Sequence, residues 1–185
     1  MLFLFFAIMM FGCTSQKTAQ DSVSAQPAYP WETCSNQLQS HACNTQAFDV
    51  SGLVELYDHY KKPIVLDLST MWCGYCQTAG REAQAIQDSY ASDDLIYITV
   101  LIENFQGEPP EMEDLVSWNT EMGITTAPVW AASRDIIGQN PEEQWALTSW
   151  PTFYFIDRDM KVKGLLRGYS HERIIEGIDI IVSEE

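Results

Sequence analysis

Basic residues are scarce in this sequence. Among its 185 residues, ten lysines and arginines are set against 26 aspartates and glutamates, which gives a formal net charge of −16. Nucleic-acid binding requires a basic surface for the phosphates, so the composition argues against a nucleic-acid partner. The same deficit argues against electrostatic attachment to anionic lipid. The acidity either keeps a folded domain soluble, which is the simpler interpretation, or favours basic partners.

The apolar run at the N-terminus is too short to cross a bilayer. "MLFLFFAIMMF" falls below the roughly 20 residues of a membrane span, but it has the length of a signal-peptide core. Gly12 before Cys13 resembles the lipobox of bacterial lipoproteins, in which the cysteine carries lipid. No basic residue precedes the run, and Met10 and Phe11 depart from the usual lipobox, so an ordinary cleaved signal and an uncleaved anchor are the alternatives. We expect residues 1–13 to be a lipoprotein-type signal segment.

Residues 14–30 are small, polar and interrupted by proline. Such a composition cannot bury a core, so we expect a flexible tether that precedes a folded domain at 31–185. With lipid on Cys13, the protein would be anchored in the bacterial cell envelope and would face the periplasm. Thr14 and Ser15 after the cysteine weakly favour the outer membrane.

Five cysteines are an odd number for an exported protein, and lipid on Cys13 leaves four that can pair. Cys34 and Cys43 enclose eight residues of an irregular segment. A structural disulfide at the start of the domain is the leading interpretation. The alternatives are a second redox pair and a metal site that includes His41, although the spacing is not that of a usual zinc knuckle.

Apolar periodicity predicts alternating helices and strands, and no internal repeat is visible. Pro63 is expected to end the first helix, and Ser170 to cap the last one. Alternating elements closed by a hairpin and a helix indicate an α/β sandwich around a mixed sheet. We expect helices over 52–62, 73–90, 111–122 and 171–183, buried strands over 63–70, 95–102 and 127–132, and two strands joined by a tight turn over 151–168.

The tetrapeptide "CGYC" follows a buried strand and opens a helix, so that Cys73 and Cys76 lie in its first turn. A thiolate is the nucleophile of disulfide exchange, and the unpaired N–H groups and the dipole at a helix N-terminus stabilise a thiolate. The second cysteine follows about one turn later, near enough to attack a mixed disulfide and release the substrate. The pattern favours a redox pair over an inert crosslink.

These residues carry a family resemblance. "VLDLSTMWCGYC" resembles the active-site strand of thioredoxins, with Trp72 before the first cysteine and Asp67 where thioredoxins keep a buried acid. "WPTFYFIDRDMKVKGLLRGY" resembles their later strand–turn–strand segment, and the likeness covers roughly residues 48–183. The extra helix and strand between 103 and 149 resemble the longer, membrane-tethered periplasmic relatives of the TlpA type. The CGYC tetrapeptide matches the active site of the periplasmic disulfide isomerase, whose separate dimerisation domain has no counterpart here.

The resemblance implies a thioredoxin fold, a mixed central sheet flanked by helices with an inserted helix–strand segment, and it implies catalytic roles. Cys73 would be the attacking thiol and Cys76 the resolving thiol, with no metal and no cofactor. Asp67 would accept the proton of Cys76 through water, unless it is an ordinary carboxylate in the strand. Pro151 matches the proline that is cis in this fold and faces the cysteines. The lysine near the buried acid of thioredoxin has no evident match.

Substrate contacts are implied in the same way. Trp72, Gly74 and Tyr75 lie beside the reactive cysteine, and the backbone of Trp150 would pair with a substrate strand. The Trp150 ring would either narrow the substrate range or act as a hydrophobic lid. Tyr75 replaces the proline of thioredoxin, a change expected to make the pair a stronger oxidant.

The sequence therefore favours a thiol–disulfide oxidoreductase of the cell envelope. Its partners would be protein thiols and disulfides and a membrane or soluble redox partner. A reductase or isomerase direction is favoured by the TlpA-like insertion and by the CGYC tetrapeptide, while the oxidant direction stays open.

Two other classes of function are weighed against this interpretation. One is a copper chaperone on the same fold, which would use two cysteines and a histidine. Such chaperones have three residues between the cysteines where this chain has two, and His171 is a remote candidate. The other is a non-catalytic binding lipoprotein in which the cysteine pair is a crosslink. Trp118, Trp130 and Trp145 would then line a partner surface, although core packing is the commoner role of such residues.

Overall fold

The computed structural model of the protein describes residues 29–183. The expected signal segment, the expected lipid site Cys13 and nearly all of the expected tether lie outside the described residues. Within the described part, no helix is both long and apolar enough to cross a membrane.

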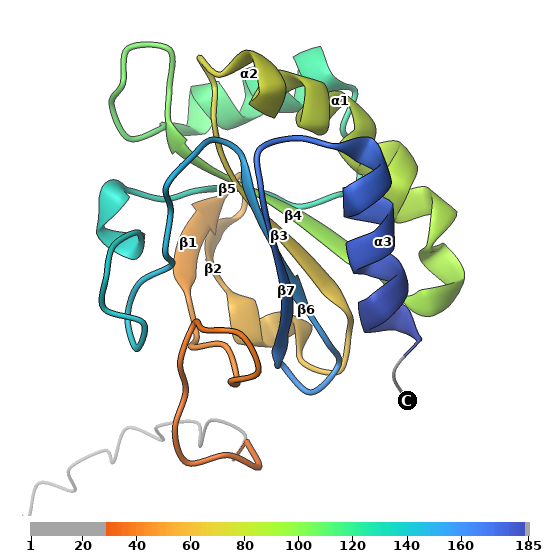
Figure 1. The fold of residues 1–185 in the computed structure, drawn as a ribbon. Coiled ribbons are helices and arrows are strands. Elements are labelled where there is room, and N and C mark those ends of the chain that lie inside the picture. The colour runs from red at the N-terminus through yellow and green to blue at the C-terminus, as the bar shows by residue number, and fades with distance from the viewer. Residues whose placement is uncertain (1–28, 184–185) are drawn as a thin grey trace, which may run out of the picture. The chain divides into compact units, whose positions relative to one another are not determined.

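A mixed sheet of seven strands forms the centre of residues 29–183, in the order β2-β1-β5-β4-β3-β6-β7 (Figure 1). Strands β3, β4 and β5 run parallel to one another, and the remaining pairs are antiparallel. The strands are β1 (Gln46–Asp49), β2 (Gly52–Glu55), β3 (Ile64–Thr70), β4 (Ile96–Glu103), β5 (Val129–Ala131), β6 (Thr152–Ile156) and β7 (Val162–Arg167).

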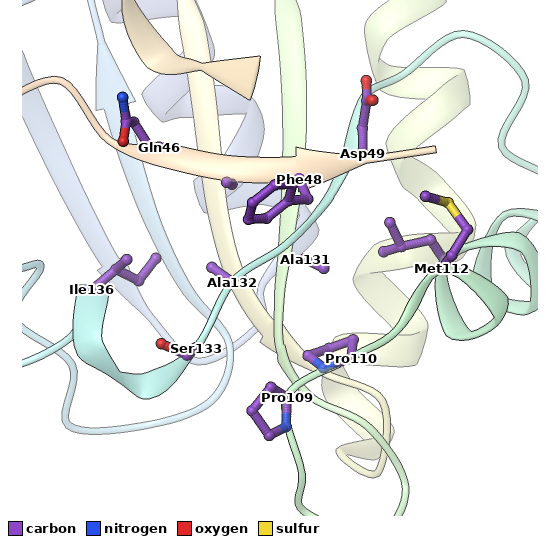
Figure 2. A pocket seen from close by; sticks show the side chains of 12 residues that line it. Gln46, Phe48, Asp49, Pro109, Pro110, Met112, Ala131, Ala132, Ser133 and Ile136 are labelled. Atoms are coloured by element: carbon purple, nitrogen blue, oxygen red, sulfur yellow. The ribbon is translucent and has the colours of Figure 1, made fainter. Parts of the chain in front are cut away.

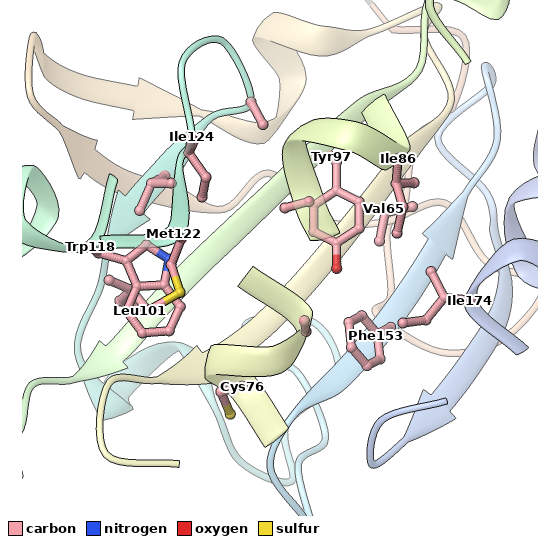
Figure 3. Close-up of a cluster of buried hydrophobic side chains, with 14 of the residues drawn as sticks. Val65, Cys76, Ile86, Tyr97, Leu101, Trp118, Met122, Ile124, Phe153 and Ile174 are labelled. Atoms are coloured by element: carbon pink, nitrogen blue, oxygen red, sulfur yellow. The ribbon is translucent and has the colours of Figure 1, made fainter. Parts of the chain in front are cut away.

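Three helices cover one face of the sheet: α1 (Gly74–Ser89), α2 (Met112–Met122) and α3 (His171–Val182). Figure 3 shows part of the apolar layer between them and the sheet, in which Cys76 and Tyr97 lie among aliphatic and aromatic side chains. The opposite face carries a second apolar cluster, which is covered by the N-terminal segment and by two short 3-10 helices, η1 (Leu56–His59) and η3 (Arg134–Ile136), with their loops. A third short helix, η2 (Ala91–Asp93), follows the end of α1.

The structure confirms most of the expected elements, including Ser170 as the N-cap of α3, where its side chain accepts a hydrogen bond from the Arg173 amide. Trp118, Trp130 and Trp145 are completely or almost completely buried, as core packing requires.

The helix expected over 52–62 is wrong. The Asp49 carboxylate accepts hydrogen bonds from the amides of Ser51 and Gly52, and this turn folds β2 back onto β1. Leu53 lies on the exposed side of the resulting hairpin. Within 52–62, the only helical residues are those of η1, Leu56–His59, of which Leu56 is buried. Pairing between strands has overridden a short helical periodicity, because the sheet satisfies backbone groups over the whole hairpin.

Candidate active site

Cys73 lies in the short connection between β3 and α1. It is the N-cap of α1 with extended backbone, and its sulfur accepts a hydrogen bond from the Cys76 amide at 3.4 Å. Both cysteines are free thiols here, and Cys76 is fully buried while the Cys73 residue keeps 9% of its surface exposed. Cys73 thus lies at the positive end of the α1 dipole, beside the unpaired N–H groups of the first turn. Of the two cysteines, only Cys73 keeps any exposed surface.

Asp67 lies on β3, on the face that packs against the helices, and it is fully buried. The Ser69 hydroxyl donates a hydrogen bond of 2.6 Å to Asp67 Oδ1. Burial raises the pKa of Asp67 to about 7, against the opposing influence of the Ser69 and Tyr97 hydroxyls. A carboxyl group with this pKa exchanges its proton near neutral pH, as a general acid–base does.

The pKa of Cys76 is raised, first by burial and then by the negative charge of Asp67. The Ser69 hydroxyl and a backbone hydrogen bond at Thr70 act in the opposite direction, because both favour the thiolate. Cys76 therefore holds its proton until a nearby base accepts it. The two thiols therefore differ in environment, because Cys73 lies at the helix N-terminus with 9% of its surface exposed and Cys76 is fully buried.

Tyr97 is a second polar group in this layer. It lies on β4 beside Val65 of β3, fully buried, and the neighbouring Thr99 pairs with Asp67. No hydrogen-bond partner lies within normal distance of the Tyr97 hydroxyl, the Thr99 hydroxyl or Asp67 Oδ2. The Tyr97 hydroxyl is still close enough to lower the pKa of the Asp67 carboxyl.

A cis peptide bond joins Trp150 to Pro151, as the resemblance implied. Thr152, the next residue, pairs with Leu68 of β3, so this bond lies at the end of the sheet where Cys73 is found. The rings of Trp72 and Trp150 meet edge to face, with their centroids 6.4 Å apart. The expected substrate-contact residues Trp72 and Trp150 are thus together.

Trp72 is hydrogen-bonded through its indole to a buried carboxylate, Glu103. Its indole N–H donates a hydrogen bond of 2.8 Å to Glu103 Oε2, and Glu103 also pairs with Arg134 of η3. The Trp72 ring nevertheless stays partly open, and Tyr75 is the more exposed of the two at 66%. Gly74, the first residue of α1, has open space around its Cα.

Cys34 and Cys43 are joined by a disulfide. The segment between them bonds to the β6–β7 turn, where the Ala42 amide donates to the Met160 carbonyl at 2.7 Å. That turn lies at the opposite end of the sheet from Cys73, since Ile156 at the end of β6 pairs with Ile64 at the start of β3. The expectation of a disulfide here is confirmed.

The described part of the chain contains no assembled site for either of the alternative metal interpretations. No group of three or more potential His, Cys, Asp or Glu ligands occurs there. His41 stacks on Trp31, and the His171 ring bonds to Glu82 on α1.

An apolar pocket of about 470 Å³ lies apart from the cysteines, between β1, β5 and the start of α2 (Figure 2). Phe48, Ala131, Met112 and Ile136 are among the side chains that line it. None of the site residues expected from the sequence belongs to its lining.

Four residues of the site were not expected from the sequence: Ser69, Tyr97, Glu103 and Arg134. A signal existed for Ser69, because residues two apart on a strand share a face, so Asp67 places Ser69 beside it. The partners Glu103 and Arg134 come from elements distant in sequence, and no local pattern connects them to Trp72.

No protein-family model matches the sequence, and a comparison with curated proteins likewise finds no match. Among solved structures, a proposed thiol:disulfide interchange protein DsbE from Chlorobium tepidum is similar at 19% identity and a TM-score of 0.65, covering 79% of this chain and 98% of that one. A proposed protein disulfide isomerase from Bacteroides thetaiotaomicron is 18% identical with a TM-score of 0.61, over 83% and 96% of the two chains. The exposed lipoprotein thioredoxin Etrx1 from Streptococcus pneumoniae is 23% identical with a TM-score of 0.60, over 75% and 99%. The chain has the thioredoxin fold that these proteins share.

Proposed function

We propose that the protein is a thiol–disulfide oxidoreductase, acting as a reductase or isomerase on exported proteins through Cys73 and Cys76. The observation that carries the proposal is the position of Cys73, at the N-cap of α1 with its sulfur facing the Cys76 amide. The buried Asp67 behind the pair and the cis Trp150–Pro151 bond at the same end of the sheet support it. The structural neighbours named as interchange proteins or isomerases agree with it.

The reaction has two exchange steps. The Cys73 thiolate attacks a substrate disulfide, forms a mixed disulfide and expels one substrate thiolate. Cys76 then loses its proton and attacks the Cys73 sulfur, which forms the Cys73–Cys76 disulfide and releases the second substrate thiolate. The substrate gains two electrons and the protein loses two. In an isomerase, the substrate thiolate expelled in the first step instead attacks another disulfide of the same substrate while Cys73 is still bound. The thiolate freed there attacks the mixed disulfide, so Cys73 leaves as a thiolate and no net electrons are transferred.

Trp72, Gly74, Tyr75 and Trp150 would form the substrate-facing surface. The exposed Tyr75 ring and the paired indoles offer apolar contact area next to Cys73, while Gly74 leaves room for a chain to approach. Such a surface suits the exposed apolar side chains of incompletely folded proteins.

A position in the bacterial cell envelope, with lipid on Cys13, the segment 14–30 as a tether and a domain over 31–185, belongs to the same proposal. The Cys34–Cys43 disulfide supports it, because disulfides persist in oxidising compartments. The similarity to an exposed lipoprotein thioredoxin is in keeping with such an anchor. The proposal also includes anchoring at the outer membrane and exchange of electrons with a membrane-bound or soluble redox partner.

Trapping of mixed disulfides in the native host tests the function. Cys76→Ser should leave substrates bound through Cys73, visible as adducts that a reductant releases, and Cys73→Ser at equal abundance should trap none. The purified wild-type protein should also reduce insulin in the presence of a thiol reductant. Absence of adducts together with absence of insulin reduction would contradict the proposal.

A further inference from the structure

We propose that Ser69 is a positioning residue that carries the proton of the Cys76 thiol to the Asp67 carboxylate. The inference deepens the proposed function and rests on it, because it assigns a route for the proton that the second exchange step must remove.

The route follows from the face of β3 on which these groups lie. Val65 contributes to the apolar layer beneath the helices, and Asp67 and Ser69 follow it at two-residue spacing on the same face. Cys76 enters this layer from the first turn of α1. Asp67, Ser69 and Cys76 are all fully buried, so a proton that leaves Cys76 has to pass to a group inside the protein.

Ser69 lies between the two ends of the route. Its hydroxyl donates a hydrogen bond of 2.6 Å to Asp67 Oδ1, and it shares the buried face of β3 beneath α1 with the layer that holds Cys76, whose pKa it lowers. A hydroxyl can accept one proton while it donates another, which a methyl group cannot do. In this proposal, Ser69 takes the place of the water through which Asp67 was expected to receive the proton.

The transfer balances within the three groups. As Cys76 attacks the Cys73 sulfur of the mixed disulfide, its proton moves to the Ser69 oxygen, and the Ser69 hydroxyl proton moves to the Asp67 carboxylate. The Cys76–Cys73 bond forms and the bond from Cys73 to the substrate sulfur breaks. Ser69 ends with the same number of protons, and Asp67 later returns its proton to solvent.

None of the other titratable groups around the route is suited to accept the Cys76 proton, so Asp67 is the base. Cys73 faces it from the start of α1 and Tyr97 from β4, while Glu82 and Tyr169 act on Tyr97 from further away. The pKa of Tyr97 is raised, chiefly by burial, so its hydroxyl stays protonated. Within the described part of the chain, no lysine, arginine or histidine shifts the pKa of Asp67 or of Cys76.

The reaction of the reduced protein with 5,5′-dithiobis(2-nitrobenzoate) separates the two steps. Attack by Cys73 releases the first thionitrobenzoate, and resolution by Cys76 releases the second, so stopped-flow absorbance measures both rates from pH 5.5 to 9. Ser69→Ala should leave the first phase unchanged and slow the second by about 10-fold to 100-fold near neutral pH, at the lower end of general acid–base effects. The deficit should shrink toward pH 9, where hydroxide removes the Cys76 proton, and Ser69→Thr should restore most of the rate.

Thr99→Val is the matched control, because it removes a buried hydroxyl beside Asp67 that makes no hydrogen bond. It should resolve at the wild-type rate. In the Asp67→Asn background, Ser69→Ala should cause no further slowing.

Two results would overturn the role of Ser69: a wild-type second phase in Ser69→Ala at every pH, or an equal penalty in the Asp67→Asn background. A wild-type protein that releases the first thionitrobenzoate but never the second would instead contradict the proposed function itself.

Discussion

At the scale of single residues, Asp67 is a carboxyl group without exposed surface, and its environment favours the protonated form. Folding raises its pKa from an ordinary value near 4 to about 7, so between these values the folded state binds the proton more tightly than the unfolded chain does. Stability contributed by this proton is present below pH 4 and is lost as pH rises to 7. A charged Asp67 is thus a cost that the fold carries at neutral pH.

We predict that Asp67→Asn raises the free energy of unfolding of the reduced protein by about 2–4 kcal/mol at pH 8 and changes it little at pH 4. Urea unfolding at a series of pH values measures this difference. Asp94→Asn, at an exposed position, is the control and should show no such pH dependence. A constant difference between Asp67→Asn and wild type from pH 4 to 8 would show that the carboxyl is not protonated by folding.

Glu103 is the second residue whose burial has a consequence for the site, because it fixes the indole of Trp72. Glu103→Leu removes the acceptor and should lower kcat/KM for a protein disulfide about threefold to tenfold, since a net hydrogen bond contributes about 0.7–1.4 kcal/mol. The reaction with a small aromatic disulfide should change little, because Cys73 itself is untouched. Glu103→Gln keeps an oxygen for the indole and should retain most of the activity; equal losses in both variants would indicate that the charge, not the position of Trp72, matters.

At the scale of elements, the packing of α3 on β6 depends on Gly177. A Cβ at this position would overlap the Phe155 ring, which fills the space beneath the helix. Alanine gains about 1 kcal/mol of helix propensity over glycine, but the overpacked contact costs about 1–3 kcal/mol. Because the sheet restrains Phe155, the contact should dominate.

We therefore predict a net loss of about 1–2 kcal/mol for Gly177→Ala in urea unfolding. Glu176→Ala, one residue earlier and exposed, should be within about 0.5 kcal/mol of wild type. A stabilised Gly177→Ala protein would mean that Phe155 moves aside freely.

The elements also show which parts of the structure a sequence can predict. β3, α1 and the cysteine pair at the start of α1 are visible locally, because an apolar run, a helix start and a fixed spacing all lie within about 25 residues. The β1–β2 hairpin was missed, because its pairing competes with a helical period of similar length. The link from Trp72 to Glu103 and Arg134 joins three elements through side chains, and only the folded sheet brings them together.

At the scale of the whole molecule, the Cys34–Cys43 disulfide holds the N-terminal segment against the far end of the sheet. Replacement of both cysteines by serine should lower the free energy of unfolding by about 2–3 kcal/mol, the entropy expected for a loop of about ten residues. The rates of both thionitrobenzoate phases should stay at wild-type values, because Cys73 lies at the opposite end. Slower phases in a protein that remains folded would indicate that this disulfide takes part in the redox cycle.

The first and the last residues of the folded domain lie at the same end of the sheet, opposite Cys73. Trp31 packs on His41 and Tyr60 next to the start of β3, and α3 runs back to the same end, where Asp179 accepts a hydrogen bond from Tyr90 at the end of α1. Figure 1 shows the first described residues and the last turn of α3 at the lower end of the sheet. A fluorophore, a solid support or a fused protein joined at either end is thus kept away from Cys73. Two such domains coupled in tandem through these ends would have the junction at the end of each sheet opposite Cys73.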